Sequence, residues 1–416
     1  MSLLWHGAAW RFWLHETNLI SRSQLRCNAD TEILTNLRAD SHRADGFRET
    51  IDAARFLFWI CPHLRVDCKC LTTMLGWAEL ESCNFFRQML MCKEISANGR
   101  QAAPAISEFA NWRSSDLLGA LFLIFGLSLT GLAVFLSSSE QTSIWLTGQI
   151  LVAVAFVQWF AILHEAGHKT LFRTQALNHV AGHLAGFFAG FPFPTWKLIH
   201  ALHHRWTGWQ DLDATTAGLT PRKRSKWLLL AVRICWACWI PIFSVIYRVD
   251  NYWNLPRLHR LFSHKRNVWR LVVSIAAVMV LYAALIYIVG PVQLLRLLGL
   301  GVLLGLMVED LLILSQHTHI PMQVSDGESV DPVPSLQQEV FTRSLRFPAW
   351  FSQLVLLNLD AHELHHMYVQ VPGYFLRRID YVPQNEIAWW KWVLKSKSVP
   401  GDVLLFQNRE QTGWEF

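Results

Sequence analysis

The chain has 416 residues, of which 52% are apolar and 16% are charged, and it contains 21 Trp and 25 Phe. Soluble domains carry about 45–50% apolar and about 25% charged residues, so this composition excludes a disordered chain or a small disulfide scaffold and indicates an integral membrane protein. The formal net charge of +6 is modest, and no basic face typical of a nucleic-acid-binding domain is apparent, so we expect no nucleic-acid partner.

Residues 1–100 differ from the rest of the chain. They are mixed in polarity, carry six of the eight cysteines and show neither sustained periodicity nor an apolar region followed by a cleavage site. The spacing of Cys61, His63, Cys68 and Cys70 fits no common zinc finger, so we expect reduced, inert thiols there rather than a zinc site. We predict an extension of unknown role, either disordered or translated from an upstream start.

Four later stretches are long and apolar enough to cross a bilayer, because about 20 helical residues span a core of about 30 Å. They are 117–136, 144–163, 268–290 and 294–315. A short polar link joins the first pair and Gly290-Pro291 separates the second, so the sequence predicts two membrane hairpins. Three glycines inside the last stretch favour close helix packing rather than a nucleotide loop: Gly299, Gly301 and Gly305.

Two further apolar stretches, 177–194 and 227–247, are interrupted by polar residues and prolines. If the second crossed the membrane, the histidines after residue 315 would face the opposite side from those at 164–204. We therefore predict that both lie in the interface, which gives a multi-pass, all-α protein with four transmembrane helices.

A basic cluster precedes the second of these stretches, at Arg222, Lys223, Arg224 and Lys226. In the four-span topology it lies on the same side of the membrane as the histidines. Because basic residues beside spans are enriched on the cytoplasmic side, we expect a histidine-rich cap in the cytoplasm.

The chain has 18 histidines, and ten of them fall in three boxes and one pair. These are His164-Glu-Ala-Gly-His168, His200-Ala-Leu-His203-His204, His362-Glu-Leu-His365-His366 and His317-Thr-His319. On a helix, residues i, i+3 and i+4 share a face, so each box aims its imidazoles in one direction. Burying so many imidazoles is costly without partners, and metal ligation satisfies them. Their number exceeds what one ion takes, so two ions are predicted, and imidazole suits iron, copper, nickel or zinc.

The three boxes, in this order on paired membrane hairpins, resemble those of the membrane fatty acid desaturases. Beyond the boxes, Gln316-His317-Thr-His319-Ile-Pro321 and the segment from Asp360 to Tyr374 resemble the acyl-lipid desaturases of the delta-12 and omega-3 type. The resemblance covers residues 112–380 and leaves 381–416 as a C-terminal tail.

The resemblance implies a non-haem diiron site that uses O2 and two electrons to form a C=C bond in an acyl lipid. Carried onto this sequence, its two Fe ions would be held by His164, His168, His200, His203, His204, His362, His365 and His366. A ninth ligand would come from the last pair, where we favour His319 over His317. The chain shows no cytochrome b5 haem motif, flavin loop or iron–sulfur spacing, so an external electron donor of ferredoxin or cytochrome b5 type is expected.

Metal-bound histidines usually donate their other N–H to a carboxylate or carbonyl. From their positions we expect Glu165, Asp310 and Asp360 to serve in this way, whereas Asp211 and Asp213 fit a solvated loop equally well. The aromatic run at 187–196 fits either the lining of an acyl tunnel or an anchor in the interface.

Two alternatives stay open. The same scaffold also serves carotenoid ketolases and hydroxylases, sphingolipid desaturases and alkane hydroxylases. A remoter alternative is an intramembrane zinc protease that uses HEAGH, with Glu165 as general base and Asp310 as third ligand, although this leaves the other two boxes unexplained.

Overall fold

The computed structural model describes residues 102–414 of the chain. The expectations for residues 1–100, including the thiols at Cys61, Cys68 and Cys70 and the neighbouring His63, lie outside the described residues. Within the described part almost every element is a helix, so the all-α class is confirmed. The exception is one short parallel pair, β1 (Leu345–Arg346) with β2 (Ile387–Ala388), in which Leu345 lies opposite Ile387.

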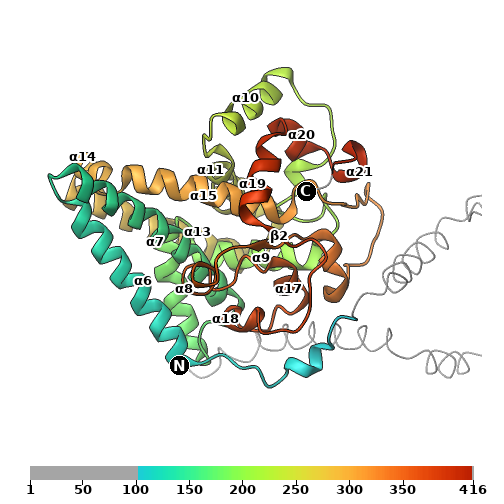
Figure 1. Ribbon diagram of the computed structural model, residues 1–416, viewed down its shortest axis with the longest axis horizontal. Helices are drawn as coiled ribbons and strands as arrows, with labels where there is room; N and C mark the ends of the chain where they lie inside the picture. Colours follow the sequence, from blue (N-terminus) through green and yellow to red (C-terminus); the bar gives the residue numbers. More distant parts are fainter. Residues whose placement is uncertain (1–101, 415–416) are drawn as a thin grey trace, which may run out of the picture. The chain divides into compact units, whose positions relative to one another are not determined.

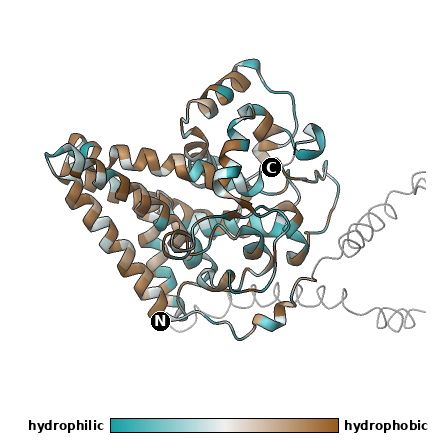
Figure 2. Cartoon of the chain, viewed as in Figure 1, coloured by the Kyte–Doolittle hydropathy of each residue, from teal (hydrophilic) through white to brown (hydrophobic). Residues whose placement is uncertain are grey.

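Four helical segments in this region are long and apolar enough to cross a membrane, as predicted. They are α6 (Asp116–Ser137), α7 (Thr142–His168), α13 (Lys265–Val289) and a continuous segment made of α14 (Pro291–Leu294), the π-helical η4 (Leu295–Gly299) and α15 (Leu300–His317). Figure 2 shows that these helices are mostly hydrophobic, whereas hydrophilic residues gather in the loops and short helices. Their crossing of a bilayer as two hairpins stays a prediction.

Shorter helices make up the rest of the fold (Figure 1). Between the long helices lie α8 (Gln175–Ala189), α9 (Phe193–Trp206), η2 (Ala217–Leu219), α10 (Lys226–Ala237), α11 (Ile242–Arg248), the π-helical η3 (Val249–Trp253) and α12 (Leu255–Leu261). Before and after them lie η1 (Ile106–Phe109), η5 (Ser335–Phe341), α16 (Ala349–Leu354), α17 (His362–Met367), α18 (Gly373–Leu376), α19 (Trp389–Lys397), α20 (Gly401–Phe406) and α21 (Arg409–Thr412).

Glycines allow α6 and α15 to pack closely on α7. A Cβ added to Gly148 would lie 2.5 Å from the backbone nitrogen of Ser137, and one added to Gly301 would lie 2.5 Å from Val152 Cβ. A Cβ on Gly305 would lie 2.8 Å from Phe156 Cδ1. Small residues at such crossings let membrane helices approach without a side chain between them. The packing interpretation of Gly301 and Gly305 is therefore confirmed.

The second interrupted stretch forms α10 and α11, whose axes are bent by 117°. The break lies at Trp239, which has a positive φ of 59°, and at Pro241, which has no N–H to continue the ladder. A bent pair of this kind is either a broken span or a re-entrant loop, so its placement in the interface stays a prediction.

The region expected only as a C-terminal tail is folded as far as residue 414. It contains β2, α19, α20 and α21, and Trp392, Leu404 and Leu405 belong to the same buried core as the long helices.

Candidate metal centre

Four elements bring the histidine boxes together. The last turn of α7 carries the first box, α9 the second and α17 the third, while α15 ends on His317. Local chemistry fixes these ends: Lys169 terminates α7 in the left-handed conformation with φ 65°, and proline starts α9. Each box thus lies at the end of a helix or on a short helix, where its imidazoles can meet those of another element.

One group, here called group one, takes histidines from all three boxes: His164, His168, His200, His204 and His365. One ring nitrogen from each lies within 4.8 Å of all the others. Adjacent Nε2 atoms are 2.8 Å apart for His168 and His200, 3.1 Å for His200 and His204, and 3.0 Å for His204 and His365.

Hydrogen bonding alone does not account for group one. A neutral imidazole Nε2 carries either one hydrogen or one lone pair, yet His200 Nε2 faces two other Nε2 atoms and so does His204 Nε2. His164 Nε2 is buried without a hydrogen-bond partner in the described part of the chain. Nitrogens about 2.1 Å from a common ion at right angles would be about 3 Å apart, so these donors fit a metal ion.

Group two lies directly beside group one and consists of His203, His317, His362 and His366. His362 Nε2 is 2.8 Å from His317 Nε2 and 3.1 Å from His366 Nε2. The two groups contact each other where the rings of His204 and His366 stack, with centroids 4.3 Å apart. The structure therefore contains two adjacent sets of ring nitrogens, each of which could hold a metal ion.

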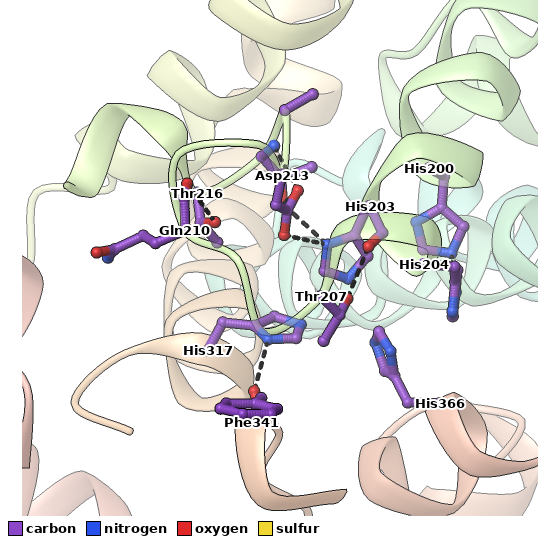
Figure 3. Close-up of polar contacts among 12 residues, drawn as sticks. His200, His203, His204, Thr207, Gln210, Asp213, Thr216, His317, Phe341 and His366 are labelled. Carbon is purple, nitrogen blue, oxygen red and sulfur yellow. Dashed lines mark hydrogen bonds and ion pairs between the residues drawn. The ribbon is translucent and has the colours of Figure 1, made fainter. Parts of the chain in front are cut away.

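Three histidines of group two have the other ring nitrogen held by an oxygen. His203 Nδ1 lies 2.7 Å from Asp213 Oδ2, His366 Nδ1 lies 2.9 Å from Gln338 Oε1, and His317 Nδ1 lies 3.2 Å from the carbonyl oxygen of Phe341. Figure 3 shows the pairs at His203 and His317. A carboxylate and a carbonyl can only accept, so Nδ1 carries the hydrogen and the Nε2 lone pair is left for a metal.

The electrostatics favour neutral imidazoles. Burial, followed by the neighbouring imidazoles, lowers the pKa well below the usual value of 6.5 for His200, His204, His362, His365 and His366. Their lone pairs are therefore available near neutral pH.

The ninth histidine of the two groups is His317, whereas the sequence favoured His319. In residues 102–414, His319 belongs to neither group. It follows the end of α15 with a positive φ of 54°, and its Nε2 lies 2.7 Å from Thr412 Oγ1. The other eight predicted histidines all lie in the two groups.

Of the carboxylates expected to orient the histidines, only Glu165 lies beside one. Its Oε1 is 3.3 Å from His164 Nδ1, while its Oε2 accepts from Thr170 Oγ1 and from the backbone N–H of Gly373, at 2.7 and 2.8 Å.

Asp310 and Asp360 have other partners. Asp310 accepts from the backbone N–H of Ser244 at 2.5 Å, and Asp360 accepts from Ser352 Oγ at 2.6 Å and from Arg377 Nη2 at 2.7 Å. The expectation for these two residues is thus corrected.

The structure also brings in residues that the sequence did not single out. Asp213, which the sequence allowed as part of a solvated loop, is fully buried and contacts His203. Gln338 and the Phe341 carbonyl come from η5, a segment without any motif, and no sequence signal pointed to them.

A cavity of about 340 Å³ adjoins the histidines and is lined in part by His164, His200, His203, His317 and His362. One face of α10 lines it further, through Leu228, Ala231, Val232 and Cys235, which follow helical spacing. From the aromatic run at 187–196, Trp196 lines the cavity, whereas Phe191 and Phe193 are buried in the core and Phe188 stacks on Trp159. Trp196 is thus the residue of that run that lines the cavity.

Comparison with known proteins identifies the family. The sequence model of a family described as "Fatty acid desaturase" matches residues 142–390, which include all three boxes and both histidine groups. The chain belongs to the fatty acid desaturase family. The chain is 24% identical over 260 residues to a probable fatty acid desaturase of Sorghum bicolor, covering 60% of the chain and 66% of that protein.

Two further relatives of the chain are about equally distant. It is 24% identical to the sn-2 acyl-lipid omega-3 desaturase (ferredoxin) of Helianthus annuus, over 59% of the chain and 57% of that protein. It is 23% identical to a fatty acid desaturase of Bacillus subtilis, over 68% of the chain and 80% of that protein. The chain spans less than two thirds of the length of the Sorghum bicolor and Helianthus annuus relatives.

Proposed function

We propose that this protein is a membrane-bound diiron desaturase that forms a C=C bond in the acyl chain of a lipid. Two hydrogens leave the acyl chain and, with two electrons and two protons from outside, reduce O2 to two waters. The observation that carries the proposal is the pair of adjacent histidine groups, with nine ring nitrogens directed inward.

In this proposal group one and group two each hold one iron ion. Breaking an unactivated C–H bond is beyond side-chain acids and bases, and the two irons would supply the O2-dependent oxidation that it requires. Asp213, Gln338 and the Phe341 carbonyl fix three of the four rings of group two so that their lone pairs point inward. The apolar cavity wall beside the histidines would orient one methylene and exclude water.

The geometry argues against the zinc protease. That mechanism needs Asp310 beside the HEAGH histidines, but Asp310 is hydrogen-bonded to Ser244 on α11. It also leaves group two without a role. The carotenoid, sphingolipid and alkane enzymes on the same scaffold differ in their products, and the names of the relatives favour an acyl substrate.

We further propose that the histidine side faces the cytoplasm and that a ferredoxin or a cytochrome b5 type protein delivers electrons there. Arg222, Lys223 and Lys226 are exposed beside the cavity and could attract an acidic carrier. Arg224 is less suited, because it is partly buried over the ring of Phe406.

The test is expression in a host that lacks such enzymes, followed by lipid analysis and metal measurement on the purified protein. For the wild type we expect new double bonds in acyl chains and two irons per chain. For His203→Ala we expect no new double bonds and fewer than two irons. The exposed His259 on α12 gives a matched control, since His259→Ala should keep both. One zinc per chain, or product formation that persists in His203→Ala, would refute the proposal.

A further inference from the structure

The C-terminal segment, defined here as residues 389–412, packs against α10. Figure 1 shows α20 beside α10. A Cβ on Gly401 is only 2.6 Å from Trp236 Cβ and 2.9 Å from the carbonyl oxygen of Val232, so the two backbones are in close contact. The family match ends at residue 390. Nearly all of this segment is therefore additional to the part of the chain that the family description covers.

Polar contacts tie the segment to α10 along its length. Arg233 donates two hydrogen bonds to Asp402, at 2.6 and 2.9 Å. Trp236 Nε1 donates to the carbonyl oxygen of Ser396 at 3.0 Å. Lys397 donates to the Trp236 carbonyl at 2.6 Å and lies 3.5 Å from the centre of its ring. The paired geometry at Arg233 and the cation–π contact at Lys397 both fix orientation.

This packing makes the segment a wall of the active-site cavity. Leu405 and Phe406 line the same cavity as the histidines, as does the α10 face that ends at Cys235. The guanidinium of Arg224 lies 3.8 Å from the centre of the Phe406 ring and covers it. Leu404, the neighbour on α20, is fully buried in the core instead.

We propose that Leu405 and Phe406 are specificity-determining residues, which limit the acyl chain that the cavity accepts and set the carbons that lie beside the histidines. The inference rests on the proposed desaturase function. In an apolar pocket one methylene changes discrimination between substrates by about 10–200-fold. A change of volume at Phe406 should therefore alter the product pattern more than the total amount of product.

The first experiment compares Phe406→Ala and Phe406→Trp with the wild type in the expression host. We expect the alanine variant to shift products toward longer chains and the tryptophan variant toward shorter ones, with the ratio of the two main products changing about tenfold. Leu404→Ala on the same helix is the control, with lower stability but an unchanged ratio. Active variants at position 406 with the wild-type ratio would overturn the proposal.

The second experiment does not depend on activity. Cys235 lines the cavity and Cys238 is exposed, so the reaction of both with N-alkyl maleimides of increasing chain length can be followed by mass spectrometry. Relative to Cys238, the reaction of Cys235 with long reagents should accelerate in Phe406→Ala and slow in Phe406→Trp. Equal reaction rates of Cys235 in all three proteins would contradict the proposal that Phe406 forms a wall of the cavity. A wild type that forms no double bonds would refute the proposed function and leave this measurement valid.

Discussion

Asp213 places a side-chain charge in direct contact with a histidine of group two, His203. It is fully buried and its Oδ2 lies 2.7 Å from His203 Nδ1, while its Oδ1 accepts from the N–H and hydroxyl of Thr215 at 2.8 and 2.9 Å. The loop after α9 is thereby folded so that one carboxylate fixes one imidazole. Such partners commonly raise metal affinity by orienting the ring and its lone pair.

We predict that Asp213→Asn lowers iron affinity by about 10–100-fold, because a neutral amide holds Nδ1–H less strongly. The measurement is iron content after dialysis against a graded chelator series. The control is Asp211→Asn, since Asp211 lies on the same loop but accepts from Ser325, with its Oδ1 3.0 Å from that backbone nitrogen. Equal losses in both variants would show that the loop, and not the carboxylate at His203, sets the affinity.

The packing of α15 on α7 positions His317 relative to the first box, since these histidines end the two helices. Gly301 lies at a close contact between the helices, and its N–H donates to Gln149 Oε1 at 2.8 Å. A side chain at this position would separate the helices and displace one histidine group from the other.

Gly301→Ala should destabilise the protein by about 1–3 kcal/mol, because the new methyl would lie 2.5 Å from Val152 Cβ and 2.6 Å from a backbone oxygen. Gly299→Ala is the matched control, since its Cβ would meet only Leu295, at 3.6 Å. Thermal unfolding in detergent measures both. A Gly299→Ala variant as unstable as Gly301→Ala would contradict the packing account.

At the scale of the whole molecule, the turn between α6 and α7 and the start of the last long segment lie together, away from the histidines. Arg296 Nη2 is 2.7 Å from Glu140 Oε1, and Trp145 Nε1 donates to the Arg296 carbonyl at 2.9 Å. If the four long helices cross a bilayer, this end and the histidine end face opposite sides. The bent pair α10–α11 decides whether a fifth crossing exists.

Cysteine labelling in sealed vesicles with a membrane-impermeant reagent tests this topology. Arg222→Cys and Arg260→Cys flank the bent pair, and we expect both to react from the face where the histidines lie, whereas Glu140→Cys should react only from the other face. Peptide mapping separates these sites from the native cysteines. Reaction of positions 222 and 260 from opposite faces would make α10–α11 a span and remove the four-span prediction.

Features that depend on near neighbours could be predicted from the amino-acid sequence. Hydropathy over about 20 residues located the four long helices, and the i, i+3, i+4 spacing of the boxes indicated eight histidines that do converge. The sequence interpretation favoured His319, whereas the structure places His317 in group two. Residues two apart on a helix differ by about 200° in direction, so the answer depends on where α15 ends.

The remaining roles depend on contacts between segments that are distant in sequence. Asp213 and Gln338 acquire their roles through the folding of irregular segments, in which no periodicity marks a buried side chain. Asp310 and Asp360 are turned to Ser244 and Arg377 by packing between elements distant in sequence. The C-terminal segment becomes a cavity wall because α20 meets α10 about 170 residues earlier in the chain, as the Arg233–Asp402 pair shows. Contacts of that range leave no local pattern, since each partner alone resembles an ordinary surface residue.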